Sequence, residues 1–323
     1  MKFAVAALIA SVAAVDRDTE IAFVNYMSTH GKMYATKEEY EFRLDIFAKK
    51  MEFIEKHNSL NADDHLVGLN HLADWTDAEY KNLLGYNNKH AEKRTRRHHK
   101  RVESAKAAPA SVDWRTEGAV TPVKNQGQCG SCWSFSATGS MEGAYKIAGN
   151  DLTSFSEQQL VDCSKAEGNM GCNGGLMDYA FTFAEKTAMD TEASYPYKGR
   201  QGTCNTSVSG VATVSNFTDV TPKSPSALQE ALALGPVSIA IDASGLGFQL
   251  YHSGVLKRFC GTSLDHGVLA VGYGSESGTD FWIVKNSWGA AWGEKGYVRI
   301  LRDMTKQDAG TCGLQLDPSY PSF

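Results

Sequence analysis

The stretch NQGQCGSCW, residues 125–133, decides the fold class, because a glycine-rich loop runs there directly into an amphipathic helix. The helix is predicted over 132–147 from apolar residues that recur at helical spacing: Trp133, Ala137, Met141, Ala144 and Tyr145. Cys132 thus stands in a first helical turn, where unpaired N–H groups and the helix dipole favour a thiolate. The thiolate is the reactive form of cysteine. The pattern indicates either a catalytic nucleophile or, with Cys129, a redox Cys-x-x-Cys pair.

The N-terminus of the chain indicates export. Residues 1–14 read as a signal peptide, with Lys2, an apolar stretch over 3–10 and small residues at the end. The alternative, a membrane anchor, needs about 20 apolar residues, so we expect no membrane span. The chain is predicted to enter the secretory pathway, for a lysosome, a vacuole or the extracellular space. Asn205 and Asn216 stand in glycosylation sequons that fit this route.

Export makes the cysteine count informative, because an oxidising compartment permits disulfides. The chain has 7 cysteines, all beyond residue 108, so at most three bridges form and one thiol is left over. The sequence leaves 15 pairings of six cysteines open. Five cysteines besides the Cys129/Cys132 pair weigh against a simple redox protein.

Composition divides the chain into a leader over 15–107 and a second unit over 108–323. The leader is predicted helical over 16–86, on an apolar face formed by Tyr40, Leu44, Phe47, Met51 and Ile54. Residues 87–107 form a basic linker with too little apolar content to pack. A nuclear signal is the alternative, which export disfavours. The second unit has a helical half, about 117–220, and a β half, about 221–315 plus the termini. The β half has short apolar runs: 237–241, 268–273, 281–284 and 297–301.

A thiolate nucleophile needs a base and a group that orients the base. His266 precedes the predicted strand 268–273, and Asn286 follows the next strand, two residues before Trp288. An asparagine amide can fix the imidazole tautomer, while the indole shields that bond from water. Each residue alone is more often structural. Together with the Cys132 loop they indicate a catalytic site.

These residues resemble the papain family of cysteine peptidases, in its cathepsin L-like subgroup. His266 and Asn286 lie 134 and 154 residues after Cys132, as the family pattern has them. In the leader, the family's interspersed motif is matched by Glu39, Arg43, Phe47, Ile54 and Asn58, and its second motif by Gly68, Asn70 and Asp74. Two positions depart from it, with Lys50 in place of Asn and Leu72 in place of Phe.

The resemblance implies an α+β fold of two domains, one helical and one β-barrel-like, preceded by a helical inhibitory propeptide. It implies a zymogen of an endopeptidase in which Cys132 is the nucleophile and forms a thioester acyl-enzyme. His266 would be the base, Asn286 its orienting partner, and Gln126 the side-chain donor of the oxyanion hole. It also implies the disulfides Cys129–Cys172, Cys163–Cys204 and Cys260–Cys312.

The resemblance further implies where substrate binds. It assigns these positions to substrate binding: Gly174, Gly175, Leu176, Met177, Ala240, Leu264, Asp265, Trp288 and Asp317. The glycine pair would let a substrate add as a strand. Asp317, at the floor of the pocket for the second residue before the scissile bond, would let that pocket accept Arg as well as a hydrophobic residue.

Other functions are less well supported. A net charge of −5 disfavours a nucleic-acid binder. Cys and His show no clustered ligand spacing, so we expect no metal and no cofactor. The alternatives within the family are an exopeptidase, which needs a blocking loop, and an inactive binding homologue, which would lack Cys132, His266 or Gln126. The expected partners are protein and peptide substrates, the chain's own propeptide and cystatin-type inhibitors, with a monomeric state.

The leader is expected to be removed near Ala107–Ala108, faster in acid. The expected causes are protonation of the linker histidines, below about pH 6.5, and of leader carboxylates at lower pH, about 4.

Overall fold

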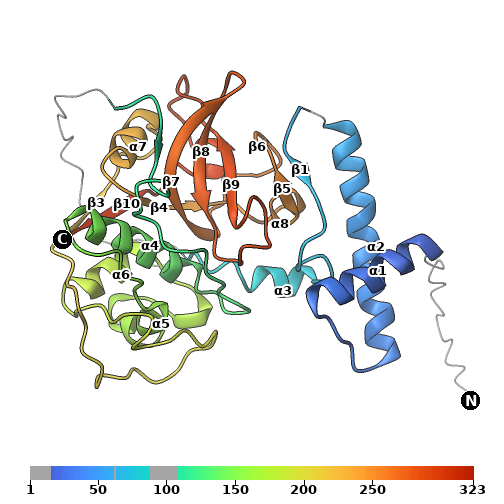
Figure 1. Cartoon of the computed structure of the whole chain (residues 1–323), viewed down its shortest axis with the longest axis horizontal. Helices are drawn as coiled ribbons and strands as arrows, with labels where there is room; N and C mark the ends of the chain where they lie inside the picture. Colours follow the sequence, from blue (N-terminus) through green and yellow to red (C-terminus); the bar gives the residue numbers. More distant parts are fainter. Residues whose placement is uncertain (1–15, 62, 88–107) are drawn as a thin grey trace, which may run out of the picture.

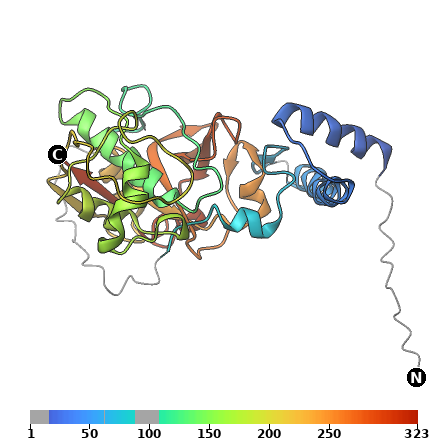
Figure 2. The same ribbon diagram turned by 90° about the horizontal axis from the view of Figure 1, so that it is seen from below.

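The computed structural model describes residues 16–61, 63–87 and 108–323. The predicted signal peptide and nearly all of the basic linker, with its histidines, therefore lie outside the described residues. The leader's α1 and α2 form one end of an elongated molecule, and the C-terminus lies at the other (Figures 1 and 2). No helix among the described residues is long and apolar enough to cross a membrane.

The leader folds around two helices and an aromatic core. Its helices are α1 (Arg17–His30), α2 (Lys37–Leu60) and α3 (Asp77–Lys81). The predicted apolar face of α2 is confirmed: Leu44 and Phe47 are buried against Phe23 and Tyr26 of α1. The prediction that residues 16–86 are helical is wrong between α2 and α3, where Leu66–Val67 form a strand, and beyond Lys81, where the chain continues without helix as far as Asn87.

The leader attaches to the second unit through backbone and side-chain bonds. Its strand β1 (Leu66–Val67) pairs antiparallel with β5 (Tyr251–Ser253). Lys50 and Leu72, which depart from the family motif, lie together. The buried Lys50 ammonium donates to the carbonyls of Leu72 and Trp75 at 2.9 and 2.6 Å, while the Leu72 side chain is fully buried among second-unit residues. Lys50 therefore donates hydrogen bonds to the Leu72–Trp75 segment, through which the leader packs against the second unit.

The helical half of the second unit contains α4 (Cys132–Ile147), α5 (Glu157–Cys163) and α6 (Met177–Ala184), with short 3-10 turns at Ser164–Glu167 and Gly171–Asn173. These helices lie on one side of the β half (Figure 1). The prediction of a helix over 132–147 is confirmed to the residue. Three disulfides brace the unit: Cys129–Cys172, Cys163–Cys204 and Cys260–Cys312. These are the pairs that the resemblance implies.

The β half is an eight-stranded sheet in the order β3-β10-β4-β7-β8-β9-β6, with β2 paired to β7. The strands are β2 (Val112–Asp113), β3 (Asn216–Asp219), β4 (Val237–Ile241), β6 (Val255–Leu256), β7 (His266–Glu276), β8 (Thr279–Lys285), β9 (Tyr297–Leu301) and β10 (Ser319–Ser322). This half also contains α7 (Pro225–Leu232), α8 (Leu246–Gln249) and a 3-10 turn at Thr311–Gly313. The predicted bounds of β4 and β9 are confirmed, whereas β7 and β8 are longer than predicted. Contacts between α4 and β7 join the two halves, and the start of each of these elements carries a candidate catalytic residue.

Candidate active site

Cys132 is the first residue of α4 and is fully buried. All other cysteines of the chain are in disulfides, so Cys132 holds the one free thiol. Its Sγ accepts backbone N–H bonds from Gly85 of the leader, at 3.2 Å, and from Gly267, at 3.3 Å. Burial raises the pKa of the Cys132 thiol to about 11, against the lowering effect of these two bonds. With the leader in place, the neutral thiol is therefore favoured.

His266 opens β7, directly before the residue whose N–H reaches the thiol. Its Nε2 lies 2.8 Å from Asn286 Oδ1, and that oxygen also accepts the Ser287 backbone N–H at 2.8 Å. Because Oδ1 is an acceptor in both contacts, Nε2 carries the proton and Nδ1 has the lone pair. Nδ1 is buried without a hydrogen-bond partner among the described residues. Burial lowers the pKa of His266 to about 4, although the Asn286 bond raises it.

Trp288 covers this pair and also fixes a third residue. Its ring centroid lies 4.7 Å from that of His266. Its indole N–H donates to Gln126 Oε1 at 3.2 Å, and the Ser287 hydroxyl donates to the same oxygen at 2.7 Å. An indole can only donate, so the orientation of the Gln126 amide is fixed. Gln126 Nε2 donates to Cys129 O at 2.8 Å and to Leu83 O of the leader at 2.9 Å.

The leader lies along this site as an added strand. Gly175 N–H donates to Gly85 O at 2.9 Å, and Asn87 N–H donates to Gly175 O at 3.1 Å. Tyr86 makes a parallel bridge with Gly175 and donates its N–H to Asp265 O at 2.9 Å. A Cβ on Gly85 would come within 1.9 Å of Gly130 O, so only glycine fits there. A Cβ on Gly174, which has φ +108°, would likewise come close to Gly85 O.

The residues predicted to line the specificity pocket gather around the side chain of Tyr86. Tyr86 belongs to one apolar cluster with Leu176, Met177, Ala240 and Leu264. Its hydroxyl donates to the carboxylate of Asp317, a residue that is only 7% exposed. The Asp317 side chain thus faces Tyr86 and not solvent.

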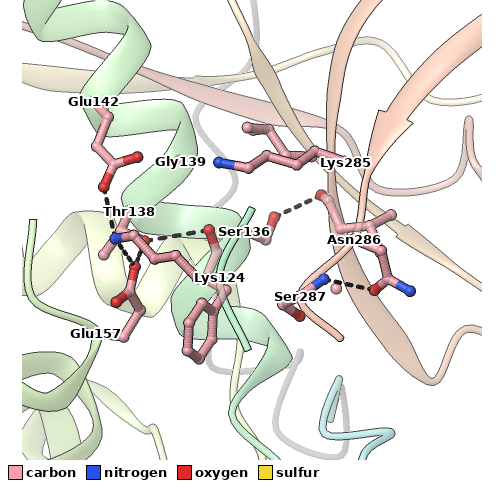
Figure 3. Close-up of a pocket in the computed structure, with 13 residues that line it drawn as sticks. Lys124, Ser136, Thr138, Gly139, Glu142, Glu157, Lys285, Asn286 and Ser287 are labelled. Carbon is pink, nitrogen blue, oxygen red and sulfur yellow. Dashed lines mark hydrogen bonds and ion pairs between the residues drawn. The ribbon is translucent and has the colours of Figure 1, made fainter. Parts of the chain in front are cut away.

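Sequence reasoning missed a buried ionic network beside the site (Figure 3). The Lys124 ammonium lies 2.9 Å from Glu142 of α4 and 2.6 Å from Glu157 of α5. Lys285, the residue before Asn286, donates to Thr121, whose hydroxyl donates to Glu142. The network therefore links the end of β8 to both helices and supports Asn286. Its members lie far apart in the sequence and match no motif, so no pattern indicated them.

Sequence reasoning also missed the leader residues that enter the site, Leu83, Gly85 and Tyr86. They follow the last leader helix and precede the basic linker, where no periodicity marks them. A buried free thiol, a histidine with one free lone pair and an oriented amide donor together form the machinery of a cysteine protease. The leader segment that lies across them makes the described chain a zymogen.

Comparison with known proteins gives the same class. Residues 108–322 match the papain family cysteine protease, and residues 23–80 match the cathepsin propeptide inhibitor domain. The chain is 47% identical over 315 residues to the probable cysteine protease RD21B of Arabidopsis thaliana, covering 95% of this chain and 67% of that protein. It is 43% identical over 320 residues to the germination-specific cysteine protease 1 of the same plant, covering 95% of this chain and 85% of that protein.

Solved structures agree in the fold. A recombinant stem bromelain precursor superposes with a TM-score of 0.87 at 38% identity, covering 95% of this chain and 99% of that one. Digestive procathepsin L 3 of Tenebrio molitor superposes with a TM-score of 0.84 at 37% identity, covering 94% and 99%. The chain belongs to the papain family of cysteine proteases. The predicted α+β papain-like fold with a helical inhibitory propeptide is confirmed.

Proposed function

We propose that this chain is the precursor of an endopeptidase that hydrolyses peptide bonds through a thioester on Cys132. The observation that carries the proposal is the bond from Gln126 Nε2 to a peptide carbonyl, Leu83 O, beside the free thiol. A substrate carbonyl in that place would receive the amide donor as its oxygen gains negative charge. The Cys132 backbone N–H would be the second donor. Removal of one such donor typically costs on the order of 10²–10³ in rate.

The steps follow from the tautomer of His266. The Cys132 thiolate attacks the substrate carbonyl carbon, a C–S bond forms and the oxygen becomes an oxyanion. Collapse of this intermediate expels the amine, which takes the proton that His266 holds on Nδ1. Water then gives a proton to Nδ1 and attacks the thioester. The carboxylic acid leaves and the starting thiolate and imidazolium return.

The leader suppresses this chemistry in two ways. It fills the site, and it buries both reacting groups, so that the Cys132 pKa lies near 11 and the His266 pKa near 4. Near neutral pH both groups are then uncharged. Departure of the leader admits water, and the proton passes from Sγ to Nδ1 to form the ion pair.

An endopeptidase is favoured over an exopeptidase by the positions of the histidines. His252 is the one histidine besides His266 in 108–323. It is exposed in β5, against Gly68 of the leader, and not in a loop that closes the cleft. The leader segment also passes through the cleft, with bonded residues on both sides of Gly85.

The specificity pocket is proposed to accept a hydrophobic residue, and also Arg, at the second position before the scissile bond. The apolar side chains around Tyr86 would hold a hydrophobic side chain or the stem of an arginine. The Asp317 carboxylate lies where a guanidinium would reach it, and such charge-assisted bonds are stronger than neutral ones.

Processing and location complete the proposal. The mature enzyme would begin near Ala107–Ala108 and act as a monomer open to cystatin-type inhibitors, after passage through the secretory pathway to a lysosome, a vacuole or the extracellular space. Asn205 and Asn216 are both exposed, which supports their glycosylation.

The test is an assay of the acid-treated protein with a fluorogenic Phe-Arg substrate and with a longer peptide quenched at both ends. Cleavage within the longer peptide, abolished by an epoxide inhibitor of cysteine peptidases, is expected. Release of terminal residues alone would indicate an exopeptidase. No cleavage of either substrate would indicate an inactive homologue.

A further inference from the structure

The specificity pocket already contains a ligand, because the leader places a tyrosine in it. Tyr86 is 7% exposed, and its main chain is held at the rung formed by Gly175 and Asp265. From that rung the ring passes through the apolar cluster, and the hydroxyl reaches Asp317. The distance from the strand to the Asp317 carboxylate is therefore the length of a tyrosine side chain.

We propose that Asp317 makes this pocket selective for tyrosine, and that the leader inhibits by presenting Tyr86 as a substrate-like side chain. The proposal rests on the proposed function and names its substrate class: chains with Tyr at the second position before the scissile bond. It goes beyond hydrophobic or Arg acceptance, because tyrosine satisfies the apolar walls and the polar floor together.

A substrate would pair with the backbone of Gly175 at the same position as Tyr86. The glycine pair at Gly174 and Gly175 leaves room for a backbone, and Gly175 has both its N–H and its C=O bonded to the leader. A substrate strand that takes over these bonds places its own side chain at the mouth of the same pocket. A tyrosine there would reach Asp317 as Tyr86 does, whereas a phenylalanine would end one atom short of it.

The size of the preference follows from the type of bond. A phenol that donates to a carboxylate makes a hydrogen bond to a charged group, which is stronger than a neutral one. Bonds to charged groups correspond to roughly ten- to hundredfold in an equilibrium or rate constant. Solvent competes when the pocket is empty, so the lower end applies. We expect kcat/KM for Tyr-Arg to exceed that for Phe-Arg by about tenfold.

The experiment compares fluorogenic Tyr-Arg and Phe-Arg substrates on the acid-matured enzyme and on its Asp317→Ala and Asp317→Asn variants. The Tyr-to-Phe ratio is expected to be about ten in the wild type, near one in Asp317→Ala and intermediate in Asp317→Asn, which keeps a neutral acceptor. Asp151→Ala, which removes an exposed carboxylate from the helical half, is the control and should keep the wild-type ratio.

A Tyr-to-Phe ratio near one in the wild-type enzyme overturns the proposal by itself. A Tyr-to-Phe ratio that Asp317→Ala leaves unchanged also overturns it. The proposed function fails separately, if no substrate is cleaved or if the epoxide has no effect on cleavage.

The precursor gives a second readout that does not depend on substrate. Tyr86→Phe removes the phenol in the pocket, and Tyr80→Phe removes another buried leader phenol, which donates to Ala243 O at 2.6 Å outside the pocket. The rate at which iodoacetamide alkylates Cys132 in the neutral precursor reports opening of the leader. Asp317→Ala and Tyr86→Phe should each raise that rate, and the double variant should match the single ones. The effect of Tyr80→Phe on the alkylation rate should add to the effect of Asp317→Ala. Additive effects of Tyr86→Phe and Asp317→Ala would contradict a shared bond.

Discussion

The leader and the peptidase unit are held together by different kinds of interaction. The peptidase has three disulfides and a large apolar core around its sheet. The leader has no cysteine, and bonds among ionisable groups supplement its aromatic core. Asp74 accepts bonds from Tyr26, Tyr34 and the Lys32 ammonium, and Arg43 makes a bidentate pair with Glu79. The leader therefore depends on these groups without the disulfides that brace the unit it inhibits.

Two bonded carboxylates of the leader, Glu79 and Asp74, have pKa values below the ordinary range. The bond from Arg43, opposed by partial burial, lowers the pKa of Glu79 to about 2. Burial raises the pKa of Asp74, but the bonds from Lys32, Tyr26 and Tyr34 outweigh it and lower that pKa. At pH values above their ordinary pKa, both carboxylates stabilise the leader. That stabilisation is lost as the pH falls through the lowered pKa values. Protonation of these two carboxylates therefore requires a lower pH than protonation of ordinary ones.

Two leader histidines that lie near the peptidase, His65 and His71, have pKa values lowered from the ordinary value. Burial, with the positive charges of Lys32 and His30, lowers the pKa of His71 to about 4. Burial also lowers the pKa of His65, against its bond to Asp64. A histidine whose pKa is lowered in the folded, docked leader binds a proton more readily once the leader comes away and unfolds. Docking is thus strongest above about pH 6.5 and weakens as pH falls towards 4.

The largest effect is expected on the peptidase side. Gln126→Ala removes the amide donor and should lower kcat of the matured enzyme by about 10²–10³, with KM little changed, because the donor acts mainly on the developing oxyanion. Steady-state kinetics with Phe-Arg measure this. Gln158→Ala, a buried glutamine of α5 bonded to Asp162 and Arg200, is the control and should leave kcat within about twofold. Equal losses of kcat in the two variants would mean that Gln126 is not an oxyanion-hole donor.

The next largest effect is expected where the leader contacts the peptidase at Gly85. Gly85→Ala places a methyl group within 1.9 Å of Gly130 O, and neither backbone can yield without disturbing the strand bonds. Alkylation of Cys132 in the neutral precursor should accelerate about ten- to hundredfold, as expected for overpacking. Gly31→Ala is the control. It also strains the leader, at φ +61°, but meets no atom within 4 Å and lies outside the cleft. An equal response to both would mean that general leader stability, and not the cleft contact, limits access.

The acid response comes next. His71→Gln removes a group that takes up a proton on release, so maturation at pH 5 should slow by about tenfold, with little change at pH 7. The rate of leader loss, followed by gel between pH 4 and 7, measures this. His252→Gln alters an exposed histidine at the same contact and should keep the wild-type profile. An unchanged pH profile in His71→Gln would place the acid sensor elsewhere.

The smallest effect concerns arginine in the specificity pocket. Asp317→Ala should lower the ratio of kcat/KM for Arg-Arg to that for Phe-Arg by about fivefold, because a charge-assisted bond to the guanidinium is lost. Raising the salt concentration should narrow this ratio in the wild type and not in the variant. An Arg-to-Phe ratio that survives the substitution would separate Asp317 from arginine recognition.

The sequence predicted those parts of the molecule that depend on local pattern. The start of α4 at Cys132 follows from helical spacing after a glycine loop, and the bounds of β4 and β9 from short apolar runs between glycines. The grouping of Cys132, His266 and Asn286 was indicated by the base and orienting group that a thiolate nucleophile needs, and the family resemblance supported it, because no local rule brings residues over a hundred positions apart together.

What the sequence did not predict depends on contacts made across the fold. Tyr86 enters the pocket because the chain beyond α3 runs against Gly175, and a single tyrosine before a polar linker carries no signal of that. The lowered pKa of His71 likewise arises from burial and from the charges of Lys32 and His30, which the folding of the leader brings close. The network of Lys124, Glu142 and Glu157 joins residues of three segments whose spacing has no period.

The most direct test of the account is the rate and position of epoxide labelling before and after acid maturation, mapped by mass spectrometry of peptides. We expect slow labelling of the neutral precursor, because the leader buries Cys132 and keeps its thiol uncharged. We expect fast labelling of the matured enzyme at Cys132 alone, and none in Cys132→Ser. A label on any other cysteine, or a neutral precursor that labels as fast as the matured enzyme, would contradict the account.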